Sequence, residues 1–126
     1  MQNVAYDQFY CEHIYVFSTL ALREILKNFD LEIFDIENTK THGGSNRYYI
    51  KKKVNKIYKI SNSVKIEIKK ELTFGLNKLS TYKIFEKKVK KSKKNLLKIF
   101  HDLNKKNLRI IGYGATAKSC TVLNYC

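Results

Sequence analysis

The chain has 126 residues, of which 44% are hydrophobic, so it could form one ordinary domain with a modest core, and its composition argues against disorder. No apolar run approaches the roughly 18 residues of a membrane span, and the start lacks the charged-then-apolar pattern of a signal peptide. The three cysteines, Cys11, Cys120 and Cys126, form no Cys-x-x-Cys motif and leave one thiol unpaired in any disulfide scheme. That pattern suits a reducing cytosol and offers no metal motif, so we expect a soluble cytoplasmic protein without a membrane partner.

The net charge of +14 is concentrated in one part of the chain. Residues 1–50 hold four Lys or Arg and seven Asp or Glu, whereas residues 51–109 hold twenty and four. A basic block of this size favours the alternative function that we consider, a small nucleic-acid-binding protein that uses residues 51–109. Only three of the basic residues are arginines, however, and bidentate recognition of phosphates and base edges favours Arg over Lys. The lysines therefore indicate solvated helix faces, and we expect no nucleic-acid partner.

The start of the chain predicts an irregular aromatic segment followed by a helix. Residues 1–17 are rich in aromatic side chains and show no helical or strand period. Ser18 is a typical N-cap for a helix over residues 19–29. The apolar stripe of this helix consists of Leu20, Leu22, Ile25, Leu26 and Phe29.

An antiparallel hairpin is predicted over residues 31–54. Residues 31–37 alternate apolar and acidic side chains in the manner of a half-buried strand. Residues 42–45 form a turn in which two glycines permit a positive φ, and residues 47–54 resume as a strand.

The second half of the chain is predominantly helical. We predict a helix over about 64–79, which Gly75 weakens, and a long basic helix over 81–106 that Asn107 ends. The buried side of the long helix is predicted to consist of Tyr82, Phe85, Val89, Leu96, Ile99, Phe100 and Leu103. Residues 108–111 then predict a short buried strand, followed by a glycine turn and a helix that opens near Ala115.

The candidate reactive residues lie in the aromatic segment. Tyr10, Glu12 and His13 place an acid beside an imidazole, among aromatic side chains and just before a helix. Imidazole has an unperturbed pKa near ~6.5, in the range that can remove a moderately acidic proton at neutral pH. From the residues alone, a helix-entry pair with tyrosines packed in a core remains open beside this catalytic interpretation.

Three ordered blocks of the chain resemble the C-methyltransferases of deoxysugar biosynthesis. The first is Tyr10-x-Glu12-His13 before a helix. The second is Thr-His-Gly-Gly-Ser over residues 41–45, followed by Arg47. The third is Gly-Tyr-Gly-Ala-Thr-Ala-Lys over residues 112–118, followed by Leu-Asn-Tyr over 123–125.

The resemblance implies a reaction and roles for the first block. The family transfers a methyl group from S-adenosylmethionine to a carbon next to the keto group of a nucleotide-linked deoxysugar. It implies that His13 is the general base and that Tyr10 and Glu12 hold the sugar and orient the base. This chain departs from the family pattern at Cys11, where a histidine is usual, at Thr116, where a proline is usual, and at Ser119, where a glycine is usual.

Four further residues are candidates for substrate binding. Lys118 and Tyr113 lie in the third block and are candidates for substrate binding, with Lys118 expected to meet the nucleotide diphosphate of the sugar donor. His42 and Arg47 flank the hairpin turn and are candidates for the same pocket. The open alternative for Lys118 is a surface lysine without a binding role. For His42 and Arg47, the open alternative is a simple structural role in the turn.

The resemblance also implies a mixed α/β organisation in which the chain is an internal fragment of a larger enzyme. Residues 1–54 would be the tail of a class I methyltransferase sheet, residues 55–106 a basic helical linker, and residues 107–126 the first β-α unit of a C-terminal Rossmann-like domain. The glycine-rich loop that binds S-adenosylmethionine and the cysteine-rich zinc module of the family have no counterpart here. We therefore expect this polypeptide alone to be inactive in methyl transfer and capable at most of proton exchange, with missing N-terminal and C-terminal portions as its partners.

Overall fold

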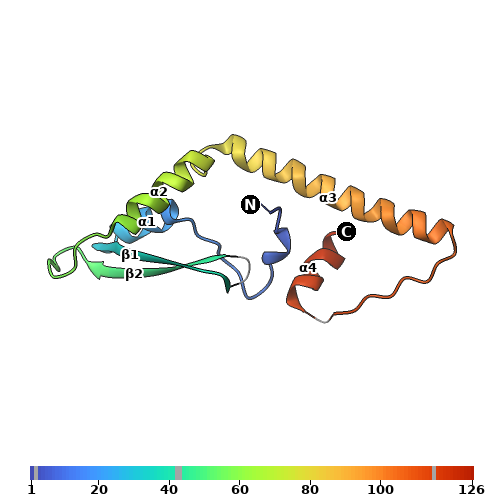
Figure 1. The fold of residues 1–126 in the computed structure, drawn as a ribbon, viewed down its shortest axis with the longest axis horizontal. Coiled ribbons are helices and arrows are strands. Elements are labelled where there is room, and N and C mark those ends of the chain that lie inside the picture. Colours follow the sequence, from blue (N-terminus) through green and yellow to red (C-terminus); the bar gives the residue numbers. More distant parts are fainter. Residues whose placement is uncertain (2, 42–43, 115) are drawn as a thin grey trace. The chain divides into compact units, whose positions relative to one another are not determined.

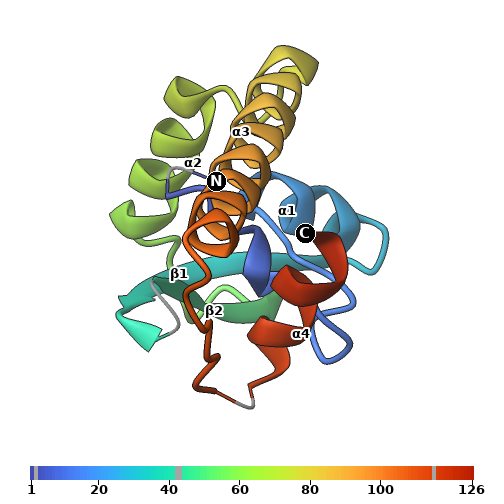
Figure 2. The same cartoon turned by 90° about the vertical axis from the view of Figure 1, so that its right-hand side faces the viewer.

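The computed structural model describes residues 1, 3–41, 44–114 and 116–126. They form two compact units, a central unit over Phe17–Leu79 and a discontinuous unit that combines Met1–Val16 with Ser80–Cys126. Within the described residues, a two-stranded antiparallel hairpin and four α-helices make up the regular structure, apart from one short 3-10 turn (Figure 1 and Figure 2). The prediction of a mixed α/β chain is therefore confirmed. The predicted divisions at residues 54 and 106 remain predictions.

Two helices cover one face of the hairpin in the central unit (Figure 1). Its elements in chain order are α1 (Thr19–Lys27), β1 (Leu31–Thr39), β2 (Ser45–Lys52) and α2 (Asn62–Phe74). The first helix and the hairpin thus match the sequence prediction to within two residues at most boundaries. The buried apolar core comprises Leu26, Ile33, Ile36 and Val64, with Leu22, Leu31, Tyr48 and Ile68 packed against it.

A β-bulge in β1 determines which side chains reach this core. The register shifts between Ile33 and Asp35, so Phe34 is an extra residue relative to β2. Without the bulge, strand alternation would send Ile33 and Ile36 to opposite faces, because they are three residues apart. With it, both side chains are buried in the same cluster.

The bulge also holds the start of α2. The backbone N–H of Ser61, the N-cap of α2, donates to the Phe34 carbonyl oxygen over 2.8 Å. The Ser63 hydroxyl donates to Asp35 Oδ1 over 2.6 Å, and the Ile36 N–H donates to the same oxygen over 2.9 Å. Hydrogen bonds stabilise the ionised Asp35 carboxylate: the Ser63 side chain has the largest effect, followed by the Ser61 side chain and the Ile36 N–H. They lower the pKa of Asp35 below its ordinary value.

The N-terminus of α1 is capped from two directions. The Ser18 hydroxyl accepts from the Ala21 N–H over 3.1 Å, as the sequence predicts for an N-cap. The second cap comes from α2: Glu71 Oε1 accepts from the Thr19 N–H over 2.6 Å, and Glu71 Oε2 accepts from the Leu20 N–H over 2.9 Å. Glu71 and Thr19 are both buried, so a carboxylate 52 positions away satisfies the Thr19 amide, which water cannot reach.

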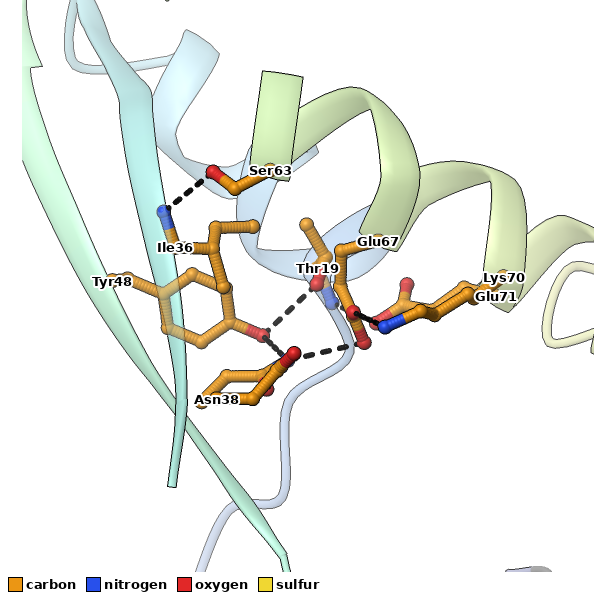
Figure 3. A network of polar contacts seen from close by, with 9 residues as sticks. Thr19, Ile36, Asn38, Tyr48, Ser63, Glu67, Lys70 and Glu71 are labelled. Carbon is orange, nitrogen blue, oxygen red and sulfur yellow. Dashed lines mark hydrogen bonds and ion pairs between the residues drawn. The ribbon is translucent and has the colours of Figure 1, made fainter. Parts of the chain in front are cut away.

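Polar contacts extend from this cap to the hairpin (Figure 3). The Tyr48 hydroxyl of β2 and the Thr19 hydroxyl of α1 lie 3.0 Å apart. The Asn46 amide donates to Tyr48 and to Glu67 of α2, over 3.4 Å in each case. The hairpin is therefore joined to both helices by hydrogen bonds as well as by the apolar core.

Gly75 ends α2, so its predicted position inside a helix over 64–79 was wrong. Gly75 has φ +86°, in the left-handed region that glycine enters without a Cβ clash. Its N–H donates to the Glu71 and Leu72 carbonyls, and the Leu76 N–H donates to the Glu71 carbonyl over 3.0 Å. This C-cap satisfies the last helical carbonyls and starts a new chain direction.

The long basic helix is confirmed as α3 (Leu79–Lys105), with 27 residues. Asn107 follows it with φ +53°, and the Leu108 N–H returns to the Leu103 carbonyl, so Asn107 stops the helix as predicted. The sequence predicted that one side of this helix is buried, and this prediction was wrong in extent, because no residue of α3 is fully buried. Five of the predicted apolar residues are half-buried, namely Phe85, Val89, Leu96, Phe100 and Leu103.

The predicted strand over 108–111 is not formed. These residues are exposed and have no strand pairing. A strand needs a neighbour for its backbone hydrogen bonds, and the sheet among the described residues contains only β1 and β2. The following helix, α4 (Ala117–Tyr125), begins after its N-cap Thr116, and Ala115 lies outside the described residues.

Removing the Glu71 carboxylate should destabilise the central unit. Glu71→Ala leaves the Thr19 and Leu20 amides without their acceptor, and we expect a loss of about 1–3 kcal/mol in the free energy of unfolding. Glu24→Ala is the matched control, because Glu24 is exposed on α1 and pairs with Arg23 and Lys27 of the same helix. Urea unfolding followed by circular dichroism measures both, and an equal change in the two variants would contradict the capping role.

Asp35 should make stability dependent on pH in the acid range. Because its folded pKa is lowered, its ionised form stabilises the fold above the unfolded value near ~4, and this contribution is lost as pH falls through the folded pKa. Asp35→Asn should therefore melt below the parent at pH 7, with a gap that closes below about pH 4. Asp102→Asn, on the exposed side of α3, is the control and should melt with the parent at pH 7.

Candidate active site

Tyr10 and His13 form one hydrogen-bonded unit in a turn. The His13 N–H donates to the Tyr10 carbonyl over 2.8 Å, which closes the turn over residues 10–13. The Tyr10 hydroxyl lies 3.1 Å from His13 Nε2, and the two ring centroids are 4.2 Å apart. His13 Nδ1 lies 2.9 Å from the Gln8 carbonyl oxygen. Both side chains are half-buried, so these bonds are partly shielded from water.

These contacts assign the tautomer of His13. A carbonyl oxygen only accepts, so Nδ1 of His13 carries the proton and donates to Gln8. In the neutral ring, Nε2 is then the basic nitrogen, and the Tyr10 hydroxyl donates to it. Nε2 can accept a further proton when the Tyr10 hydroxyl turns away, or through that hydroxyl as a relay. The arrangement is chemically suited to general-base catalysis.

Glu12 lies beside this unit with an exposed side chain. Hydrogen bonds with the Gln8 carbonyl and the Tyr10 hydroxyl orient the imidazole in the structure. Sequence reasoning missed Gln8, because the contact uses its backbone carbonyl and gives no signal in residue type. The orienting role assigned to Glu12 stays a prediction.

The Tyr10 segment packs against α4 within the discontinuous unit. The Thr121 hydroxyl of α4 donates to the Phe9 carbonyl over 2.7 Å. Tyr6, in the 3-10 turn η1 (Tyr6–Gln8), places its hydroxyl 3.7 Å from Cys126 Sγ and its ring edge-on to Tyr125, with centroids 5.5 Å apart. Residues more than 110 positions apart thus form one surface.

An open depression of about 480 Å³ lies between these two segments. It is lined by Phe9, Tyr10, Cys11, Ala117, Cys120, Thr121, Asn124 and Tyr125. Tyr10 belongs to both the depression and the imidazole pair. Sequence reasoning missed the contribution of Thr121 and Asn124, because only the tertiary contact places α4 beside the aromatic segment.

The four predicted substrate contacts fall in different places. Tyr113 is fully exposed in the loop before α4, and Lys118 is half-buried in the first turn of α4. Arg47 belongs to β2 in the central unit, where it pairs with Glu37 over 2.9 Å. His42 lies outside the described residues. The structure therefore brings together Tyr10 and His13, whereas the roles of the other four stay predictions.

The described residues do not fit S-adenosylmethionine. In the sequence, only Gly112 and Gly114 form a Gly-x-Gly element, and they lie in an exposed loop outside any strand. A Cβ added at either glycine would meet no atom within 4 Å, so nothing there resembles the close backbone cradle of a nucleotide loop. In the same described ranges, no group of three or more His, Cys, Asp or Glu side chains is placed to hold a metal, and no helix is long and apolar enough to cross a membrane.

Comparison with known families assigns the class of protein. The family model of the C-methyltransferase C-terminal domain matches residues 40–126. The chain therefore belongs to the C-methyltransferase C-terminal domain family. The match includes β2, α2, α3 and α4, whereas the Tyr10–His13 unit precedes it. No curated protein matches the chain.

The tautomer of His13 can be measured directly. In long-range ¹H–¹⁵N spectra of the neutral imidazole, His13 should show a protonated Nδ1 and an unprotonated Nε2. Tyr10→Phe should retain this tautomer, because the Gln8 carbonyl remains. His101, exposed on α3, is the internal control and should show a tautomer mixture. A protonated Nε2 at His13 would contradict the assignment.

Proposed function

We propose that this chain contributes the general base and part of the sugar site of a C-methyltransferase that methylates a carbon next to the keto group of a nucleotide-linked deoxysugar. Membership of the C-methyltransferase family supports the reaction class. The resemblance of the three sequence blocks supports a nucleotide-linked deoxysugar as the substrate. The Tyr10–His13 unit, with Nε2 as the basic nitrogen, is the observation that carries the role of this chain.

The chain's own step is removal of a proton. His13 Nε2 takes the proton from the carbon beside the ketone, the C–H bonding pair becomes an enolate, and the ring becomes an imidazolium. The Gln8 carbonyl stabilises the protonated ring through Nδ1–H. The Tyr10 hydroxyl, released from Nε2, is a donor for the enolate oxygen. Together, the two side chains can hold both charges that the step creates.

The methyl donor that the family implies is S-adenosylmethionine, and it supplies the methyl group to the enolate carbon. The described residues do not hold it, so no step of this proposal passes through a donor site on this chain. Proton removal is the part of the reaction that these residues can perform and that can be measured without a donor.

Loss of His13 should abolish proton exchange at the sugar. The full chain is incubated in D₂O with thymidine diphosphate 4-keto-6-deoxyglucose as the probe, and deuterium uptake beside the ketone is followed by NMR. General-base catalysis is typically worth about 10²–10⁴-fold in rate, so His13→Ala should lower the protein-dependent exchange by at least two decades. Tyr10→Phe should lower it less, because the base remains.

Two controls make this result specific. His101→Ala removes an exposed imidazole of α3 and should leave the rate unchanged. A protein-free sample gives the spontaneous rate. If His13→Ala exchanges at the parental rate, or if the parent does not exceed the spontaneous rate, the proposed base is wrong.

A further inference from the structure

The side chains that line the depression beside Tyr10 are uncharged, and Lys93 of α3 lies behind one of them, with its Nζ 4.6 Å from the centroid of the Tyr125 ring. The aromatic surface of the depression comes from Phe9, Tyr10 and Tyr125, and its polar atoms come from hydroxyl, thiol and amide groups. Lys118 is on the same helix but is not among the lining residues. We propose that this depression binds the pyranose ring of the nucleotide sugar and that Asn124 is the residue that reads a ring hydroxyl. This inference rests on the proposed function and deepens it.

The composition of the walls matches a sugar ring better than a diphosphate. The C–H faces of a pyranose are apolar and can pack on aromatic side chains, whereas its hydroxyls need a few placed polar groups. A diphosphate requires cationic or N–H donors, and the lining side chains include no cation. The volume of about 480 Å³ is within the range of small-molecule sites.

Asn124 has hydrogen-bonding capacity to offer. Its Nδ2 donates to the Cys120 carbonyl one turn earlier, over 2.8 Å. This bond fixes the side-chain amide and leaves Oδ1 as an acceptor for a hydroxyl. Because the orientation is set before the ligand arrives, little side-chain entropy is lost on binding.

The depression is also connected to the candidate base. The bond from Thr121 to the Phe9 carbonyl holds α4 against the segment that carries Tyr10. Tyr10 lines the depression and bonds His13 Nε2 over 3.1 Å. A sugar ring in this position would therefore contact the side chain that is already hydrogen-bonded to the basic nitrogen.

The test compares two probes on the isotope-labelled full chain, followed by NMR titration. Thymidine diphosphate 4-keto-6-deoxyglucose should shift the amides of residues 117–125 and the Asn124 side-chain amide. Thymidine diphosphate alone should leave the amides of residues 120–125 and the Asn124 side-chain amide unchanged. Asn124→Ala, which keeps a helix-favouring residue, should raise the Kd for the sugar probe about tenfold through loss of one hydrogen bond. Asn95→Ala, at an exposed asparagine of α3, is the matched control and should leave the Kd unchanged.

Three outcomes would overturn the inference: equal shifts with thymidine diphosphate alone, no shifts at residues 117–125 with either probe, or an unchanged Kd in Asn124→Ala. The exchange experiment with His13→Ala separates this inference from the proposed function. His13-dependent exchange with an unchanged Kd in Asn124→Ala would reject only the ring site. A tenfold effect of Asn124→Ala without His13-dependent exchange would reject only the chemistry.

Discussion

The buried carboxylate of Glu71 is the interaction on which the central unit most depends. It comes from α2 and accepts hydrogen bonds from the first two amides of α1, so one side chain connects two helices and satisfies the buried amide of Thr19. The macrodipole of α1 adds attraction, because a negative charge lies at its N-terminus. α1 begins directly after the aromatic segment, so the same cap fixes where that segment ends.

Such polar connections have unusual weight here because the core is small. Among the described residues, four apolar side chains form the buried core, and many large apolar side chains are exposed, among them Ile14, Val54 and Ile111. Apolar burial contributes roughly 25 cal/mol per Å², so a core of this size leaves little margin. The Glu71 cap and the contacts of Asp35 with the start of α2 supply specificity that the apolar cluster alone would not give.

In the candidate site, local contacts orient the Tyr10 and His13 side chains, whereas long-range contacts form the surface beside them. A single turn over residues 10–13 brings Tyr10 to His13 and fixes the imidazole through the Gln8 carbonyl. Contacts with α4 then create a surface beside Tyr10 on which a ligand can be placed. The base is thus prepared by its immediate neighbours, whereas the binding surface requires residues from the other end of the chain.

The sequence by itself determined the features that depend on short-range chemistry. The Ser18 cap, the hairpin, the long basic helix and its stop at Asn107 were all predictable, because capping groups, alternation and helical period act within a few residues. The adjacency of Tyr10, Glu12 and His13 likewise identified the candidate site, and the three-block resemblance indicated the family that the comparison then confirmed.

Tertiary structure decided the rest. In the sequence, Gly75 is equally consistent with a weak position inside a helix and with the end of a helix. In the structure, its N–H donates to the Glu71 and Leu72 carbonyls, and these bonds end the helix there. Residues 108–111 have the composition of a strand but no paired partner among the described residues. The cap by Glu71 and the depression beside α4 join residues 52 and 112 positions apart. No local pattern encodes such pairs, because their energy exists only once the chain has folded.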